Sequence, residues 1–216
     1  MRLLLNPSKK WCYIAIKKNC SMTFSTFLQQ NGWTDVSMRD AEELNCRYFS
    51  HIQNPFERYY KGIAEILYKQ PDAQVHLMQN GLIPTMFLDD HVLPISVLTN
   101  DISRFIHFIP MDYYKYSCNE LTNDFFAENN IDLKIRNGDV KHVSSTKKKP
   151  FQQKVRKQLE IGYNSYLRVL YATDLKLHNA AIKRISSPPL ELFVEPKTLM
   201  DNVRIFFANY FINSSR

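Results

Sequence analysis

The sequence predicts an α/β protein of three layers, with a short central parallel sheet flanked by helices and a helical C-terminal portion. Strand-like and helix-like patterns alternate over the first 70 residues, which is typical of a parallel sheet covered by helices. Of the 216 residues, 44% are hydrophobic and 23% are charged, as in globular proteins rather than disordered or fibrous ones. A chain of this length can bury a core without disulfides or metal, and we expect a single domain over residues 1–216.

Three strands are expected in the first third of the chain, each a short run rich in β-forming residues. They lie over residues 12–17, 34–38 and 46–53. A helix is expected over residues 24–30, because the Asn-Gly pair that follows ends the helical pattern. A second helix is expected over residues 55–68, where a proline occupies the first turn and apolar residues recur at helical spacing.

The remainder of the chain is predicted to add two strands and several helical segments. Residues 104–109 (RFIHFI) are strand-like, and residues 131–136 (IDLKIR) alternate as a half-exposed strand does. Residues 121–128 are helix-like, and residues 151–185 are expected to be mostly helical with a break near a glycine. After a proline pair, a closing helix is expected over residues 199–211.

Charge and composition narrow the classes of function. The net charge is +7, and the stretch from Lys134 to Lys157 holds nine basic residues and one acid, so it either solvates a loop or meets an anion. The four cysteines form no C-x-x-C motif and do not cluster with histidine, so we expect reduced thiols and no metal site. Only five glycines are present, which argues against a glycine-rich phosphate loop of the dinucleotide-binding or kinase type.

Membrane insertion and secretion are not expected. The sequence has no run of 18 apolar residues that would span a bilayer. Its opening segment, MRLLLNPSKK, has three leucines before a proline and a lysine pair, too short a core for a signal peptide. We therefore expect a soluble, cytoplasmic protein with no membrane partner.

The first candidate site is the turn KKNCSMT, which joins the strand over residues 12–17 to the following helix. A turn that enters a helix directs several backbone N–H groups at one point, where the helix dipole favours negative charge. Lys18 adds a positive charge, and Ser21 and Thr23 can cap the helix or donate to phosphate oxygens. Cys20 is expected to have a lowered pKa in this position. The alternative is an ordinary N-cap that follows an exposed lysine pair.

The second candidate site is the segment QNPFERYYK (residues 53–61), again where a strand enters a helix. Arg58 and Lys61 lie three residues apart and share a helical face, and the helix start offers a second anion site. Two such sites at the carboxyl ends of parallel strands suit a ligand with two separated anionic groups. The alternative is a helix with a solvated basic face.

These two elements together resemble the nucleotide-binding elements of sulfotransferases that use 3′-phosphoadenosine 5′-phosphosulfate (PAPS). In that family a strand leads into a loop of the form Lys-x-Gly-Ser-Thr-Ser, which cradles the 5′-phosphosulfate. Lys18, Ser21 and Thr23 match the loop, whereas Cys20 replaces the glycine and Met22 replaces the first threonine. For Cys20, a small residue in the glycine position is favoured over a redox role.

The family's second element, Arg-Asp/Asn-Pro-x-x-Arg-x-x-Ser, holds the 3′-phosphate of the donor. Asn54, Pro55 and Arg58 match it, but Gln53 replaces the leading arginine and Lys61 the closing serine. Lys61 can restore the lost positive charge, because its flexible stem can place an ammonium where the arginine would have reached. The alternative is that the donor site has decayed, leaving a sulfotransferase fold that binds something else.

Further segments resemble carbohydrate sulfotransferases of the Golgi type, in the same order along the chain. Residues 90–94 (DHVLP) resemble an Asp-x-His-x-x-Pro segment, and residues 105–112 lie where those enzymes have a strand followed by an acidic segment. Residues 142–149 (HVSSTKKK) resemble a His-x-Asn-x-Ser loop, and residues 170–174 (LYATD) resemble a late Leu-Tyr-x-x-Asp helix. The resemblance runs, in patches, over residues 12–178.

The resemblance implies a PAPS-dependent sulfotransferase that acts without metal on a hydroxyl acceptor, with carbohydrate as one acceptor class. The acceptor would attack sulfur in line, and adenosine 3′,5′-bisphosphate would leave, with Lys18 stabilising charge on the departing phosphate oxygen. The nucleotide donor is expected to contact the two elements and the lysine tract. The residues implied are Lys18, Asn19, Cys20, Ser21, Met22, Thr23, Phe24, Gln53, Arg58, Lys61 and Lys147.

The sequence offers several candidates for the general base that takes the acceptor's proton. We choose His91, because it lies in a matching segment and histidine titrates near neutrality, with Asp40 in reserve. The alternative for His91 is a partly buried histidine bonded to nearby backbone. Glu42 and Glu43 are interpreted as a solvated helix start, and His51 as a core residue of an apolar strand.

Two other functions compete with this interpretation. A non-enzymatic anion or nucleic-acid binder is favoured by the net charge of +7, the basic stretch and the abundant aromatic residues. Against nucleic acid, the basic stretch is not interleaved with aromatic residues as a stacking platform would be, so this partner is not expected. A P-loop kinase is the weakest alternative, because the Walker A glycines and the Gly-Lys-Ser/Thr triplet are missing.

Overall fold

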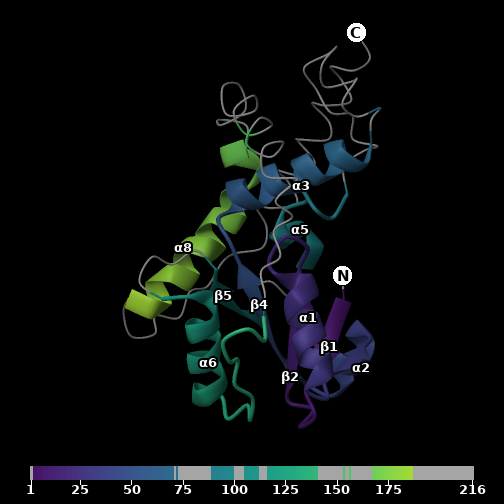
Figure 1. Ribbon diagram of the computed structural model, residues 1–216, viewed down its shortest axis with the longest axis vertical. Coiled ribbons are helices and arrows are strands. Elements are labelled where there is room, and N and C mark those ends of the chain that lie inside the picture. Colours follow the sequence, from purple (N-terminus) through teal and green to yellow (C-terminus); the bar gives the residue numbers. More distant parts are fainter. Residues whose placement is uncertain are drawn as a thin grey trace.

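A computed structural model of the chain describes residues 2–70, 89–99, 105–111, 116–140 and 167–186, together with residues 72, 153 and 156. Its helices and strands are shown in Figure 1. Their order is β1 (Arg2–Leu5), β2 (Trp11–Ala15), α1 (Ser21–Gln30), β3 (Thr34–Val36), α2 (Met38–Glu43), β4 (Arg47–Ile52), α3 (Pro55–Lys69), α5 (Ile95–Thr99), β5 (Ile106–Pro110), α6 (Cys118–Glu128) and α8 (Ala172–Ser186).

The strands form one five-stranded sheet in the order β3-β1-β2-β4-β5. β2, β4 and β5 are parallel neighbours, whereas β1 runs antiparallel to both β2 and β3. The α/β class, the expected strands at β2 to β5 and the helices at α1, α3, α6 and α8 are confirmed. The expectation of a parallel sheet is wrong in one respect, since the sheet is mixed around a parallel core.

The antiparallel strand β1 was not expected, and a single asparagine explains it. The N–H of Asn6 donates to the carbonyl oxygen of Trp11 (2.9 Å), and the Asn6 side-chain oxygen accepts from the N–H groups of Lys10 and Trp11 (2.9 Å each). Lys9 has a φ of 55°, which completes the tight turn. The three leucines of the opening segment therefore form a hairpin with β2.

Helices cover both faces of the sheet, as the three-layer expectation requires. Trp11, Tyr13 and Ala15 of β2 belong to a core that includes side chains of α1 and α6. Cys12 and Ile14 point to the other face and belong to a core that includes side chains of α2, α5 and α8. This alternation along one strand places both faces of β2 in the interior, which suits a central strand of a parallel core.

The expected strand over residues 131–136 is not formed. The segment does alternate, because Ile131 and Ile135 are buried against the core shared with α1 and α6. The backbone of Ile135 bonds to the side chain of Asn123 and not to a neighbouring strand. The side-chain oxygen of Asn123 accepts from the N–H of Ile135 (2.7 Å), and its amide donates to the Ile135 carbonyl (3.0 Å).

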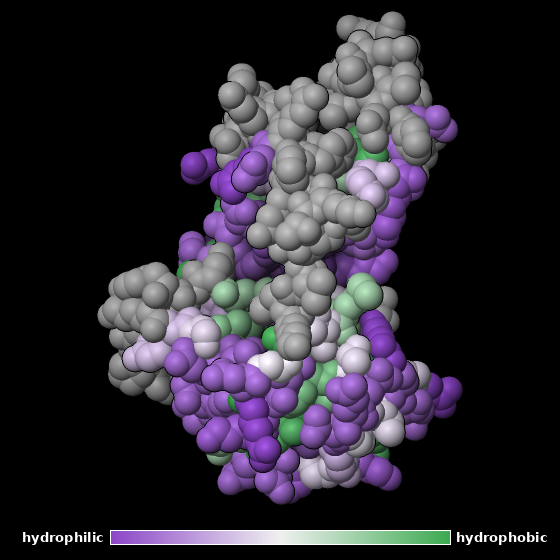
Figure 2. All heavy atoms as spheres, in the orientation of Figure 1, coloured by the Kyte–Doolittle hydropathy of each residue, from purple (hydrophilic) through white to green (hydrophobic). Residues whose placement is uncertain are grey.

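Several sequence predictions fall outside the residues that the structure describes. They concern the loop over residues 142–149 with Lys147, the greater part of residues 151–166, the proline pair, and the closing helix over residues 199–211. Among the described helices, none is long and apolar enough to cross a bilayer. On the face shown in Figure 2, the described surface is mostly hydrophilic, and hydrophobic residues gather in a strip near its centre.

His107 on β5 gives the fold a specific dependence on pH. Burial, aided by the charge of Arg184, lowers the pKa of His107 from 6.5 to about 4. The unfolded chain therefore binds this proton first as pH falls, and stabilisation present above pH 6.5 is lost between 6.5 and 4. The loss amounts to about 3 kcal/mol.

Urea unfolding of the wild-type chain and of His107→Gln, followed by circular dichroism from pH 7 to pH 4, tests this expectation. The variant should show a flatter fall in the free energy of unfolding over that range. Parallel curves for the two proteins would show that His107 does not carry the effect.

Candidate functional site

Two loops meet at the carboxyl edge of the sheet, beyond the ends of β2 and β4. The loop over residues 16–20 leads from β2 into α1, and Gln53 and Asn54 lead from β4 into α3. The strands are adjacent and parallel, but the chain leaves β2 toward β3 on one side and leaves β4 toward β5 on the other. Such a switch point leaves a crevice between two loops, where open α/β sheets bind their ligands.

Side-chain hydrogen bonds join the two loops. The amide of Asn19, which is fully buried, donates to the carbonyl oxygen of His51 (2.9 Å). The amide of Gln53 donates to the carbonyl oxygen of Lys18 (2.6 Å), and the ammonium of Lys61 donates to the Gln53 side-chain oxygen (2.7 Å). Lys61 therefore brings its charge to the residue that stands where the resembling family has an arginine.

The start of α1 retains the features of an anion site. Lys18 and Cys20 have φ values of 68° and 60°, and Cys20 is the N-cap without a side-chain hydrogen bond to the helix. The N–H groups of residues 21–23 have no partner within the helix, because a first turn lacks the preceding carbonyls. Ser21 is buried, whereas the Met22 side chain is 85% exposed, so the turn lies at the surface.

The backbone of Cys20 is left-handed, a conformation that glycine adopts without strain. The expected lowering of the Cys20 pKa is wrong. Burial raises the pKa of the thiol to about 11, and the nearby Phe24 N–H only partly opposes that shift. Cys20 is therefore a neutral thiol at physiological pH, which argues against redox chemistry at this position.

Phe24 belongs to the core and is corrected as a nucleotide contact. Its N–H donates to the carbonyl oxygen of Cys20 (3.1 Å), so that donor is already used inside the helix. Its ring is 1% exposed and lies edge-on to Tyr13 and His51, with centroids 4.8 and 4.5 Å apart. The interpretation of His51 as a core residue is confirmed, since its ring also bonds Thr122 (3.0 Å).

The start of α3 differs from that of α1, because its N–H groups are already capped. The side-chain oxygen of Asn54 accepts from the N–H groups of Phe56 (2.9 Å) and Glu57 (3.4 Å), and Pro55 has no N–H. The expectation of a second anion site at this helix start is therefore wrong. The group left to bind an anion here is the ammonium of Lys61, which is an exposed residue.

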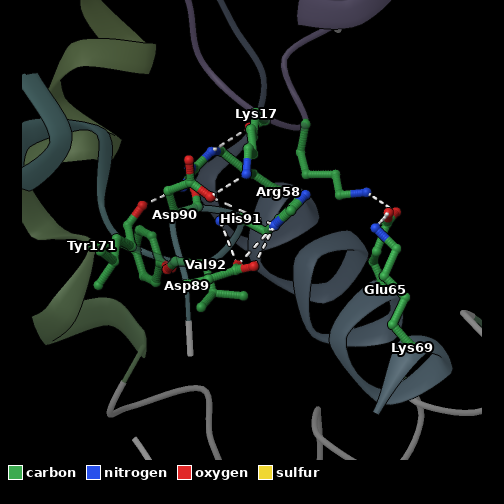
Figure 3. A network of polar contacts seen from close by, with 11 residues as sticks. Lys17, Arg58, Glu65, Lys69, Asp89, Asp90, His91, Val92 and Tyr171 are labelled. Atoms are coloured by element: carbon green, nitrogen blue, oxygen red, sulfur yellow. Dashed lines mark hydrogen bonds and ion pairs between the residues drawn. The ribbon is translucent and has the colours of Figure 1, made fainter. Parts of the chain in front are cut away.

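Arg58 is corrected from a phosphate contact to a structural residue. It is fully buried, and its guanidinium donates to three backbone carbonyls, those of Lys17 (3.1 Å), Asp90 (2.9 Å) and Leu93 (Figure 3). Burial lowers the pKa of the guanidinium. Arg58 thus ties the loop after β2 to the segment over residues 89–93 and is not accessible to a ligand in this structure.

The charge of Lys18 lies at the site but already has an acidic partner. The Lys18 ammonium pairs with the carboxylate of Glu65 on α3, and the other carboxylate oxygen pairs with Lys69 at 2.6 Å (Figure 3). The side chains of Lys18 and Glu65 are 17% and 18% exposed, so solvent screens the pair only in part. An incoming anion must compete with Glu65 for this ammonium.

The segment over residues 89–93 forms a second cluster beside the first loop (Figure 3). Both carboxylate oxygens of Asp89 lie 2.8 Å from His91 Nδ1, and Asp89 also accepts from the His91 backbone N–H. Burial raises the pKa of Asp89, but these His91 contacts outweigh it, so the pKa lies below its ordinary value. Counting back from His91, the aspartate of the resembling pattern is Asp89, one residue earlier than the sequence interpretation placed it.

The tautomer of His91 follows from this contact. An ionised Asp89 keeps the proton on Nδ1, which leaves Nε2 as the lone-pair nitrogen that could accept a proton. Nε2 makes no hydrogen bond to any residue in the described ranges. The His91 side chain is 15% exposed, and Lys17 pairs with the neighbouring Asp90 at 2.6 Å.

The same cluster could in principle hold a metal ion, which the sequence did not suggest. One ligand atom from each of Asp89, Asp90 and His91 lies within 4.8 Å of the others. Each carboxylate already has a cationic or N–H partner, Asp90 in Lys17 and Asp89 in His91. Each carboxylate therefore has a partner without a metal, and no step of the chemistry below requires one.

Tyr171 and Asp174, at the start of the C-terminal helical portion, bond to the backbone of residues 92–96, which follow His91. The hydroxyl of Tyr171 donates to the carbonyl oxygen of Val92 (Figure 3). Asp174 is fully buried and accepts from the N–H groups of Ile95 (2.6 Å) and Ser96 (3.0 Å), so it caps α5. These are the tyrosine and aspartate of the late Leu-Tyr-x-x-Asp match.

Gly62 on α3 sets how closely the helix approaches this segment. A Cβ at this position would lie 2.4 Å from the carbonyl oxygen of His91 and 2.7 Å from a Val92 methyl group. Gly62→Ala is therefore expected to lower the free energy of unfolding by about 1–3 kcal/mol and to displace the His91 loop. Gly62→Ser is expected to lower the free energy of unfolding more than Gly62→Ala does, because its side chain is larger. Thermal melts of both variants test this, and an unchanged melting temperature for both would contradict the close contact.

Asp40 does not join the other candidates. It lies in the first turn of α2, where its N–H and carboxylate bond the N-cap hydroxyl of Ser37 (3.1 and 2.6 Å). In Figure 1, α2 lies toward the opposite end of the sheet from α3. Asp40 is therefore corrected as a reserve base. Glu65 and Asp89 were missed by sequence reasoning, because only the fold brings them to Lys18 and His91.

Comparison with known proteins adds no relative. No protein-family model matches the chain, no curated protein matches it, and no solved structure matches it. The function must therefore be argued from the geometry of the site.

Proposed function

We propose that the chain is a sulfotransferase that moves a sulfuryl group from PAPS to a hydroxyl acceptor, with carbohydrate as the acceptor class to test first. One observation carries the proposal. Four segments far apart in the sequence, over residues 17–23, 53–61, 89–94 and 170–174, meet in one network of contacts at the carboxyl edge of the sheet. They are four of the six segments whose sequences resemble this family.

The donor would lie across the two loops. Its 5′-phosphosulfate fits the uncapped start of α1, where backbone N–H groups and the Lys18 ammonium provide donors and positive charge. Its 3′-phosphate would meet Lys61, which replaces Arg58 in that role because Arg58 is buried. Lys61 already lies beside Gln53, at 2.7 Å from its side-chain oxygen.

In the proposed transfer, the acceptor oxygen forms a bond to sulfur as the bond from sulfur to the phosphate oxygen breaks. Adenosine 3′,5′-bisphosphate leaves with the electron pair, and the ammonium of Lys18 stabilises the charge that develops on its phosphate. The acceptor's proton goes to His91 Nε2, with Asp89 holding the ring and stabilising the imidazolium. Catalysis rests on positioning and charge, as in phosphoryl transfer.

Transfer of ³⁵S from labelled PAPS to a panel of sugars and phenols tests this assignment. His91→Asn is expected to lower kcat by about 10²–10⁴. Asp89→Asn should lower kcat less and shift the acidic limb of the pH profile, because it perturbs the base without removing it. Arg39→Gln, on the exposed face of α2, is the control and should leave transfer unchanged. Transfer that survives His91→Asn would remove the histidine from this role.

The burial of Arg58 and the capped start of α3 favour a second candidate, in which the fold binds a simpler anion without catalysis. In that case the start of α1 would hold one phosphate, and the 3′-phosphate would add no affinity. Equal binding of AMP and of adenosine 3′,5′-bisphosphate would support this candidate.

A further inference from the structure

A cavity of about 530 Å³ lies at the amino-terminal edge of the sheet, away from the site described above. Its residues come from the starts of the three parallel strands and from the end of α2 and the turn that follows it. They are Trp11, Glu42, Asn45, Cys46, Arg47, Tyr48, Phe105 and His107. The parallel direction of β2, β4 and β5 places this cavity opposite the edge that carries Lys18 and His91.

Aromatic rings supply the walls of the cavity. Trp11 and Tyr48 are each 7% exposed and belong to the cores on opposite faces of the sheet, whereas Phe105 is 61% exposed. Trp11 is held edge-on against Phe125, with centroids 5.1 Å apart, and the His107 ring lies against the same Phe125 at 4.5 Å. The core therefore fixes the positions of Trp11 and His107, and the exposed Phe105 offers contact area to a planar aromatic ligand.

His107 adds a polar group inside this wall. Its pKa of about 4 keeps the ring neutral at physiological pH, so one nitrogen donates a hydrogen bond and the other accepts one. Neither nitrogen bonds to a residue among those that the structure describes. A ligand that enters the cavity can therefore use both.

The charges around the cavity favour a ligand with one negative charge. The Arg47 guanidinium lies 5.7 Å from the centre of the Trp11 ring, at the cavity's side. The backbones of Lys9 and Lys10 bond Cys46 and Arg47, so the exposed lysines of that turn stand at the same edge. Glu42 is the acid in the lining, and it repels negative charge near Tyr48.

We propose that this cavity binds a planar aromatic ring that carries a single anionic group, such as an aromatic carboxylate. The ring packs against the exposed Phe105 beside the edge of Trp11, and the anionic group pairs with Arg47. The site is separate from the proposed donor site, because the two lie at opposite edges of the sheet.

Calorimetry with 4-nitrobenzoate and its neutral counterpart 4-nitrobenzamide tests the proposal on the full chain. Fluorescence provides a second readout in a Trp33→Phe background, where Trp11 is the remaining tryptophan and the nitro ring quenches it on contact. The expected result is one binding site per chain, quenching of Trp11, and an affinity for the amide that is at least about 10-fold weaker.

Substitutions locate the binding. Arg47→Gln is expected to weaken the binding of 4-nitrobenzoate about 10-fold, because it removes the cation. Phe105→Ala is expected to weaken that binding about 5-fold, because it removes one wall of the cavity. Arg39→Gln, which removes an exposed cation elsewhere on α2, should change nothing. Saturation with adenosine 3′,5′-bisphosphate should not displace the probe. Absence of binding, equal affinity for acid and amide, or insensitivity to both cavity variants would each overturn the proposal.

Discussion

Replacing Arg58 with methionine is expected to lower the free energy of unfolding by about 3 kcal/mol or more. The arginine is fully buried and donates to the carbonyl oxygens of Lys17, Asp90 and Leu93. Its removal leaves three partly buried carbonyl acceptors without this donor, and a buried acceptor left unsatisfied costs about 1–3 kcal/mol. Chemical denaturation of the variant, followed by circular dichroism, measures the loss.

The lysine variant separates geometry from charge at this position. Arg58→Lys keeps the positive charge, but a single ammonium cannot span three carbonyls as a planar guanidinium does, so most of the loss should remain. Arg39→Met is the matched control, because its exposed pair with Glu43 contributes no more than about 0.5 kcal/mol. If the free energy of unfolding of Arg58→Met differs from that of the wild-type chain by no more than about 0.5 kcal/mol, the guanidinium does not hold the loop after β2 and residues 89–93 together.

Replacing Lys18 with methionine is expected to reduce sulfuryl transfer by about 10²–10³ in kcat/KM, the usual cost of losing one donor to developing charge. Lys18 lies in the loop before α1, and its side chain, whose ammonium pairs with Glu65 of α3, is less than one-fifth exposed. The fold should survive, because the lost contact is a partly exposed ion pair. Steady-state rates with labelled PAPS measure the effect.

Lys69→Met is the matched control for this experiment. Lys69 pairs with the same carboxylate of Glu65 at 2.6 Å, but it lies at the end of α3 and outside the loop. Its removal is expected to change kcat/KM by less than about threefold, because exposed pairs contribute little. Equal losses in the two variants would indicate that Glu65, and not the position of Lys18, governs the activity.

The sequence predicted most elements of the fold, because strand and helix patterns in the first half are short and well separated. It missed β1, since three leucines before a proline carry little signal until Asn6 closes the hairpin with Trp11. It also assigned a strand to residues 131–136, where the alternation is real but the Asn123 side chain supplies the backbone partner. Both errors depend on contacts between residues, which a local pattern does not contain.

The candidate site was predicted in part. The loop that holds Lys18 and the segment that holds His91 could be found, since both are local patterns. The burial of Arg58 could not be predicted. The spacing of Arg58 and Lys61 along the helix is the same whether Arg58 lies on an exposed basic face or is buried against backbone carbonyls. Glu65 and Asp89 become relevant only when α3 and residues 89–93 pack against the first loop.

The central claim is that the carboxyl edge of the sheet binds a nucleotide with two separated anionic groups. Calorimetry with adenosine 3′,5′-bisphosphate, run beside AMP and ATP, tests it most directly on the wild-type chain and on Lys18→Met and Lys61→Ala. The account predicts that the bisphosphate binds at least about 10-fold more tightly than AMP and that both substitutions weaken it. Equal affinity for AMP and the bisphosphate, or no binding of either, would contradict it.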